Sequence, residues 1–198
     1  MKKQSKTTKE IKMKFKNLIN PFTYIAGWQA FGIGIAFVLL MGVVGSLSGV
    51  YFDGALDAHL SKRGNFYHSF LFLGIDIVCV TLFMWIAALF FSKNVRLIDM
   101  LGTMTLSKAP MLIVACMGFM VSEEMVFSLS GNPLAILTMP SLIVFSMLII
   151  PFIVWSIALM YNAFKVSSGM KGNRTIFVFI AALLLAEIVS KIIIAYIV

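Results

Sequence analysis

The chain contains an uncharged run of 23 residues, Trp28 to Val50. At the ~1.5 Å rise per residue of an α-helix, such a run is long enough to cross the ~30 Å hydrocarbon core of a bilayer. The apolar core of a cleaved signal peptide is shorter, roughly 7–15 residues. The run therefore predicts an uncleaved first membrane span.

Composition extends this interpretation to the whole chain. Hydrophobic residues make up 61% and mean hydropathy is +1.00, against roughly 45–50% apolar residues in an ordinary soluble domain. Charged residues make up 12% and cluster between apolar runs. We predict an all-α polytopic membrane bundle of about five transmembrane helices plus interfacial amphipathic helices. The expected spans are 28–50, 69–91, 109–129, 141–162 and 175–198.

The N-terminal segment, residues 1–20, is basic, with seven lysines before residue 17. Ile11, Phe15 and Leu18 recur at helical spacing, with lysines on the opposite side, which predicts a short interfacial helix on an anionic inner leaflet. A disordered tail is the alternative. The expected organisation is thus a basic tail over 1–20 and a transmembrane domain over 21–198.

Orientation follows from the distribution of positive charge. With the N-terminus inside, thirteen of the 16 Lys and Arg lie on the cytoplasmic side, in residues 1–20, 93–108 and 165–174. Two lie outside, at residues 62–63, and Lys191 lies within the last span. This positive-inside bias predicts a cytoplasmic N-terminus and an external C-terminus. Because the charge is explained by topology, and no basic face with interleaved aromatic residues is present, nucleic acid is not an expected partner.

Small residues recur in the second half of the first span, at three- and four-residue intervals. Gly42, Gly45, Ser46 and Gly49 are expected to let a second helix backbone approach closely. The two cysteines, Cys79 and Cys116, each lie in an apolar run and are expected to be packing residues rather than a disulfide or metal site.

Ionisable residues within or beside the expected spans are the candidate functional residues. A charge near the bilayer centre costs roughly 2.5–3.5 kcal/mol on insertion scales, so these side chains are expected to face protein and find partners. Glu187 and Lys191 are four residues apart, a favourable helical pairing, and Asp76 is expected at a depth similar to that of Lys191. We predict a polar cluster of Asp76, Glu187 and Lys191, joined by Glu123 or Glu124. It is either an ion-pair network that fixes packing or a proton- or ion-coupled path.

The outer connection contains further polar side chains. Asp53, Asp57, His59 and His68 are all metal-ligand types, but their spacing matches no compact metal motif. A solvated polar loop is the preferred interpretation. No cofactor is expected, because the sequence contains neither a phosphate-cradling glycine loop nor a paired-histidine zinc helix.

Several of these features resemble the Yip1 family of five-span membrane proteins. The resemblance runs from about residue 18 to the end and is carried by the basic N-terminus, Asn20-Pro21, Trp28, Val154 to Leu159, Ala163 and Gly169. Eukaryotic members act in vesicle traffic and contact small GTPases through a long hydrophilic N-terminal region. The tail here is short, so the chain is more similar to the bacterial members, and the resemblance implies a bacterial inner membrane.

The preferred function is a non-enzymatic integral membrane protein of Yip1 type, which organises the bilayer or a partner protein. Its expected partners are membrane lipids, with a protein partner or a second copy of the chain. The alternative is a small transporter or channel that uses the intramembrane acids. An intramembrane enzyme comes third, because the sequence offers no identifiable base–nucleophile pair.

Overall fold

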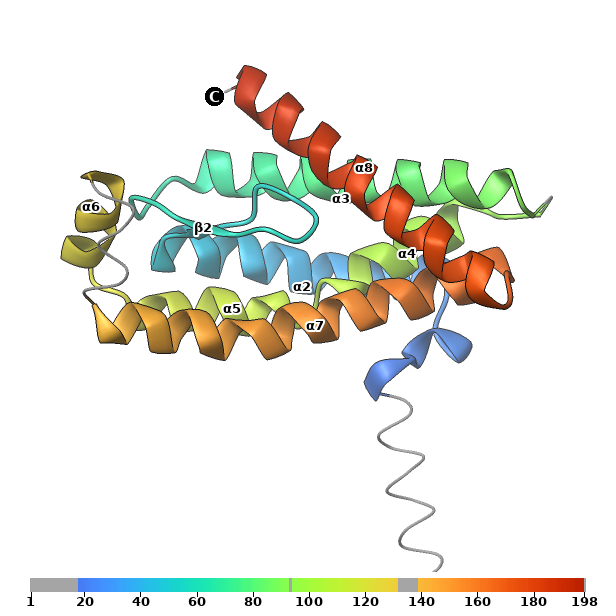
Figure 1. Cartoon of the computed structure of the whole chain (residues 1–198), viewed down its shortest axis with the longest axis horizontal. Coiled ribbons are helices and arrows are strands. Elements are labelled where there is room, and N and C mark those ends of the chain that lie inside the picture. Colours follow the sequence, from blue (N-terminus) through green and yellow to red (C-terminus); the bar gives the residue numbers. More distant parts are fainter. Residues whose placement is uncertain (1–17, 93, 132–138, 198) are drawn as a thin grey trace, which may run out of the picture.

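The computed structural model of the chain describes residues 18–92, 94–131 and 139–197. The all-α class predicted from hydropathy is confirmed, and five helical stretches are long and apolar enough to cross a membrane (Figure 1). In chain order the elements are η1 (Pro21–Thr23), α2 (Gly27–Ser48), β1 (Val50–Tyr51), β2 (His59–Leu60), α3 (Phe66–Leu89), α4 (Leu97–Ser107), α5 (Met111–Met117), η2 (Gly118–Met120), α6 (Glu123–Gly131), α7 (Pro140–Ser168) and α8 (Asn173–Ile197).

Local sequence explains where several of these helices begin and end. α3 begins after Asn65, whose side-chain oxygen accepts a hydrogen bond from the His68 backbone N–H at 3.1 Å, as a helix cap requires. α2 ends at Gly49 and α7 at Gly169, with φ of 81° and 66°. These left-handed conformations favour glycine, and in both cases the cap N–H bonds back into the helix.

The long helices lie side by side along the long axis of the molecule, except α8, which crosses α3 obliquely (Figure 1). α2 packs against α4, and α3 packs against α8. The third apolar stretch, Leu97–Met120, is the most enclosed, with 67% of its most apolar window buried. The corresponding values for α7 and α8 are 22% and 28%, so these two helices present most of their surface outwards.

The third span differs from the expected one. It runs over Leu97–Met120 rather than 109–129, and is broken between α4 and α5. Residues 97–108 were left outside the expected spans, and hydroxyl residues interrupt their apolar pattern. In the structure Thr103 and Thr105 donate to the carbonyls four residues earlier, both at 2.7 Å. Their hydroxyls are thus satisfied within the helix, and α4 can be buried.

The connection between α2 and α3 folds back into the bundle. β1 and β2 pair antiparallel, with Val50 opposite Leu60 and Tyr51 opposite His59. We call residues 50–60 the hairpin and residues 53–58 its tip. Figure 1 shows the hairpin entering from the end that carries α6 and pointing towards the middle of the bundle. Tyr51, Phe52 and Ala55 are each 2% exposed, so the apolar residues of this connection are buried, while Asp57 and His59 are exposed.

The predicted small residues of α2 lie against α3 and the hairpin, and Ser69 of α3 donates to the Gly42 carbonyl at 2.8 Å. An added Cβ at Gly42 would meet the Phe70 ring, and one at Gly45 would lie 2.6 Å from the Val50 carbonyl of the hairpin. Ser46 is fully buried, and Gly49 ends the helix. The backbones of α2 and α4 approach closely earlier in α2, where a Cβ on Gly34 would lie 2.6 Å from the Leu106 backbone nitrogen.

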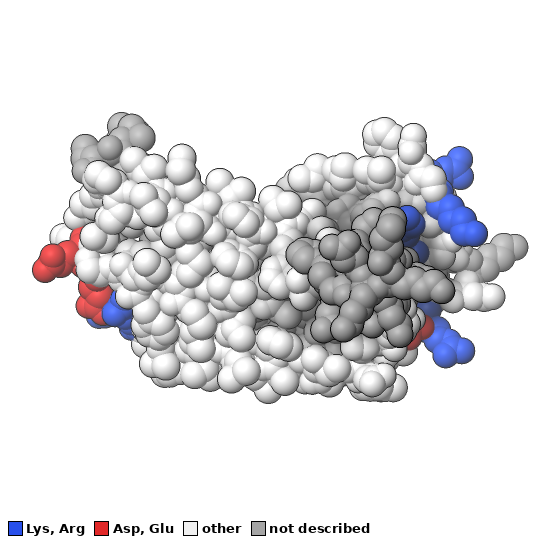
Figure 2. Space-filling view, turned by 90° about the horizontal axis from the view of Figure 1, so that it is seen from below, with Lys and Arg blue, Asp and Glu red and all other residues white. Residues whose placement is uncertain are grey.

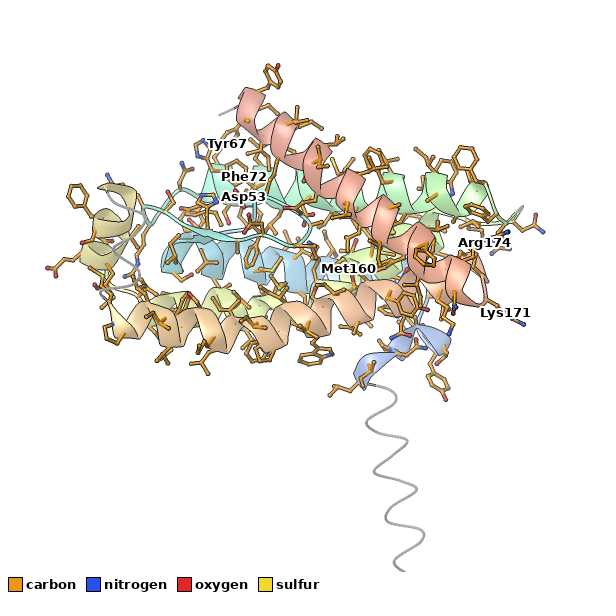
Figure 3. The ribbon with its side chains drawn as sticks, viewed as in Figure 1. Asp53, Tyr67, Phe72, Met160, Lys171 and Arg174 are labelled. Carbon is orange, nitrogen blue, oxygen red and sulfur yellow. The ribbon has the colours of Figure 1, made fainter. Side chains whose placement is uncertain are left out.

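Charged side chains gather at the two ends of the molecule and leave the middle apolar on the face seen in Figure 2. Lys171 and Arg174 lie at the end opposite α6 (Figure 3). The first described residues, Leu18 and Ile19, contact α7, where their carbonyls accept hydrogen bonds from Trp155 and Asn162. The rest of the interfacial helix predicted over 1–20 lies outside the described residues. The cytoplasmic assignment of this end remains a prediction from charge.

Candidate functional site

A buried ion pair lies in the middle of the bundle. Lys108 Nζ lies 2.6 Å from Asp76 Oδ2, and the two side chains are 4% and 0% exposed. The same ammonium donates to the Ala55 carbonyl at 2.8 Å. A charge of each sign is thus neutralised where no solvent reaches it, and a backbone acceptor of the hairpin tip is satisfied at the same point.

Lys108 reaches this position because it sits at the break of the third span. α4 ends at Ser107 and α5 begins after Pro110, which has no backbone N–H to continue the helix. Sequence reasoning placed Lys108 on the cytoplasmic side, and the structure contradicts that placement. Without it, twelve Lys and Arg lie in the segments predicted to be cytoplasmic and two in the segments predicted to be external.

A second group of charges holds the other side of the hairpin tip. Glu187 of α8 accepts a hydrogen bond from the Leu56 backbone N–H at 3.0 Å and lies 3.4 Å from Lys191. Lys191 in turn lies 2.5 Å from Asp57. Gly54 rests against the Glu187 carboxylate, where an added Cβ would clash. The absence of a side chain at residue 54 therefore lets α8 approach the tip.

The predicted polar cluster is thus arranged differently from what was expected. Asp76 pairs with Lys108 rather than with Lys191, while Glu187 and Lys191 do approach each other. Glu123 and Glu124 lie exposed at the start of α6, at one end of the molecule.

Sequence reasoning missed two parts of this site. One is Lys108, and the other is the hairpin tip, which lies between the Asp76–Lys108 pair and the charges of α8. A lysine two residues before a proline, between two apolar segments, is the signal that would have found Lys108, because discontinuous spans mark binding regions in membrane proteins. The second depends on contacts between residues far apart in sequence.

Unpaired polar atoms accompany the ion pair. Asp76 Oδ2 contacts the lysine ammonium, but Asp76 Oδ1 is buried with no hydrogen-bond partner among the described residues. The same holds for Asp53 Oδ1 and for the hydroxyls of Ser46 and Thr81. Buried polar groups are normally satisfied by protein or ordered water. The described interior of the bundle therefore contains carboxylate and hydroxyl oxygens that could accept hydrogen bonds from a further group.

The residues of metal-ligand type in the α2–α3 connection are dispersed among different partners. Asp53 Oδ2 lies 3.0 Å from His59 Nδ1, Asp57 pairs with Lys191, and His68 Nδ1 lies 2.8 Å from the Asn65 amide nitrogen. Within the described ranges, no group of three or more His, Cys, Asp or Glu side chains is placed to hold a metal ion.

The pairing of Asp53 with His59 changes the pKa of the Asp53 carboxyl. Burial of the Asp53 carboxyl acts to raise its pKa, but the hydrogen bond and charge of His59 act in the opposite direction and prevail. The pKa of Asp53 is therefore lower than the ordinary value of 3.8. The carboxylate is ionised at neutral pH and fixes the orientation of the His59 ring.

No model of a known protein family, no curated protein and no solved structure matches this chain. Its most distinctive arrangement is the hairpin tip, held inside a helical bundle by Lys108 from one side and by Glu187 and Lys191 from the other. Non-helical backbone at membrane depth is tolerated only where protein or a cavity surrounds it. The buried charges provide the polar partners that this backbone requires.

Proposed function

We propose that the chain is a non-enzymatic integral membrane protein of Yip1 type, which organises the surrounding bilayer or a partner protein. The observation that carries this proposal is that the interior charges are used within the bundle. Lys108 neutralises Asp76 and bonds the hairpin, and Glu187 accepts the Leu56 N–H. Charges used in this way stabilise the architecture of the bundle.

The cavities support this proposal over a transport path. Four cavities with volumes of about 290 to 820 Å³ lie in the described part of the molecule, and none of these four is lined by Asp76, Lys108 or Glu187. A transporter binds its substrate near the membrane midplane, in a cavity reached alternately from the two sides. The side chains of Asp76 and Lys108, in the middle of this bundle, are 0% and 4% exposed.

The outward surfaces provide what an organising protein needs. α7 and α8 have the least buried apolar windows of the five spans. Large apolar side chains stand out from α7, including Val144, Met147 and Ile150, each more than half exposed. In a bilayer such faces contact lipid tails, another protein or a second copy of the chain.

A small transporter or channel is the second candidate, and one observation favours it. The third span is broken at Lys108 and faces a re-entrant hairpin, with buried carboxylate oxygens that have no hydrogen-bond partner among the described residues. Discontinuous helices and unwound backbone near the midplane form the ion and substrate sites of many transporters. This candidate requires the hairpin to move and open a path.

Two measurements separate the candidates. The first is purification from the native membrane in mild detergent, with identification of bound lipids and proteins. A stoichiometric protein or a selectively retained lipid supports the organising role. The second is ion flux in proteoliposomes, with Asp76→Asn and Glu187→Gln as variants. A flux that is lost in variants that still fold overturns the organising role and establishes transport.

A further inference from the structure

We propose that the cavity between the hairpin and the start of α3 binds a phosphate-bearing anion. Its volume is about 380 Å³, within the range of about 300–1,000 Å³ typical of small-molecule sites. The lining includes four nitrogen-rich side chains from one short stretch: His59, Lys62, Arg63 and His68. The proposal goes beyond the organising role, because it assigns a ligand to a site away from the buried charges.

The cavity is built on a braced turn. The Tyr51 hydroxyl donates to the Lys62 carbonyl at 2.8 Å and accepts from the Asn65 N–H at 3.2 Å. These two bonds hold residues 62–65 in place between the hairpin and α3. Arg63 is fixed from the other side, where its guanidinium donates to the Val121 carbonyl at 2.7 Å. The cations therefore belong to an ordered rim rather than to a free loop.

The two histidine rings in the cavity wall are held in place by stacking. His68 stacks on Phe72, with ring centroids 5.6 Å apart, and His59 stacks on Tyr51 at 5.7 Å. Because Asn65 Oδ1 accepts from the His68 backbone, its amide nitrogen is the group that faces His68 Nδ1. Nδ1 must then accept, so neutral His68 carries its proton on Nε2 and remains a donor at that atom.

Charge favours an anion at this place. The described residues that line the cavity include no Asp or Glu, and the neighbouring carboxylate of Asp53 is paired with His59. Glu123 and Glu124 line a separate, larger cavity, and Lys62 and Arg63 line both cavities. The two glutamates therefore compete with a bound anion for these cations. The first turn of α3 adds the positive end of a 24-residue helix dipole. A phosphate group offers several acceptor oxygens to such diverging donors.

The ligand chemistry has two sources, a soluble phosphate compound or a phospholipid headgroup, and the experiment distinguishes them. Protein purified in an uncharged detergent is titrated calorimetrically with inorganic phosphate and with glycerol 1-phosphate, against chloride at equal ionic strength. In parallel, native mass spectrometry measures phosphatidylglycerol retained from mixed nanodiscs, relative to phosphatidylcholine. Lys62→Gln and His68→Gln are the test variants. Lys171→Gln, an exposed lysine at the opposite end, is the matched control.

Saturable binding of either soluble probe, or selective retention of phosphatidylglycerol, is expected. Lys62→Gln should weaken the affinity for the probe roughly tenfold, which is the scale of one hydrogen bond to a charged group. Lys171→Gln should leave the affinity unchanged. Binding of the soluble probes identifies a free phosphate compound as the source, and lipid retention alone identifies a headgroup. Because Lys62 is exposed, its variant should keep the wild-type circular dichroism spectrum. Absence of both signals in the wild type, or an equal loss in Lys171→Gln, overturns the proposal.

Discussion

Lys108 lies 2.6 Å from Asp76 in the middle of the bundle, at the point where the third span breaks and the hairpin tip arrives. The ammonium joins the third span to two other elements. It contacts α3 through Asp76 and the hairpin through the Ala55 carbonyl. A buried pair adds little net stability over apolar residues, but loss of one partner leaves an uncompensated charge. The structure therefore predicts a strong asymmetry between single and double substitutions.

Asp76→Asn and Lys108→Met should each reduce the free energy of unfolding in detergent by about 3–5 kcal/mol, because each leaves one buried charge unpaired. The double variant should lose less than the sum of the two, with a coupling of about 0.5–3 kcal/mol. Denaturant titration of all four proteins measures the cycle. Additive losses would show that the two side chains do not interact.

Glu187→Ala should lower the free energy of unfolding by about 1–3 kcal/mol, because the part-buried Leu56 N–H loses its acceptor. Glu187→Gln keeps an acceptor oxygen and should cost less. Its lost ion pair with Lys191 is worth little, since the Lys191 side chain is 44% exposed. Glu124→Ala, at an exposed residue of α6, is the control and should change stability by less than about 0.5 kcal/mol. Equal losses for the two Glu187 variants would assign the effect to charge instead.

Gly102→Ala should destabilise the bundle by about 1–3 kcal/mol, as overpacking does, because its Cβ would clash with the Gly27 carbonyl and lie 2.9 Å from the Phe31 nitrogen. Gly74→Ala is the matched control, since a Cβ there meets nothing within 4 Å. That control should be neutral or stabilising by up to about 1 kcal/mol, as helix propensity predicts. Thermal unfolding of both variants compares them. A neutral Gly102→Ala would show that α2 and α4 do not approach closely.

Ala55→Cys should resist a water-soluble maleimide in the folded protein, because residue 55 is 2% exposed at the hairpin tip. Lys62→Cys, on the exposed rim of the same connection, should react readily. Both are made in a background with Cys79→Ala and Cys116→Ala, and mass spectrometry counts the labels. Rapid labelling at residue 55 would show that the hairpin lies outside the bundle.

The apolar runs predicted the helical class, because continuous hydropathy over a span-length segment is a local property. The structure has apolar helices over four of the expected spans, with ends that differ by a few residues. The third was placed too late, since Thr103, Thr105 and Lys108 read as polar until their bonding partners are known. Hydropathy scores a side chain alone and cannot include a hydrogen bond or an ion pair that conceals it.

The candidate site was predicted only in part for a related reason. Glu187 and Lys191 are helical neighbours, so their approach is visible in the sequence. The bonds from Lys108 to Ala55 and from Leu56 to Glu187 join residues 53 and 131 positions apart. No local pattern encodes such contacts, and the polar composition of the α2–α3 connection indicated solvent rather than a folded hairpin.

The sidedness of the two ends tests the central claim, five crossings of the membrane with the lysine-rich end inside. An impermeant thiol reagent is applied to intact cells and to lysed cells that carry Lys62→Cys or Lys171→Cys in the cysteine-free background. The predicted result is labelling of Lys62→Cys in intact cells and of Lys171→Cys only after lysis. Labelling of both positions from the same side would contradict the five-span arrangement, and the reverse pattern would contradict its orientation.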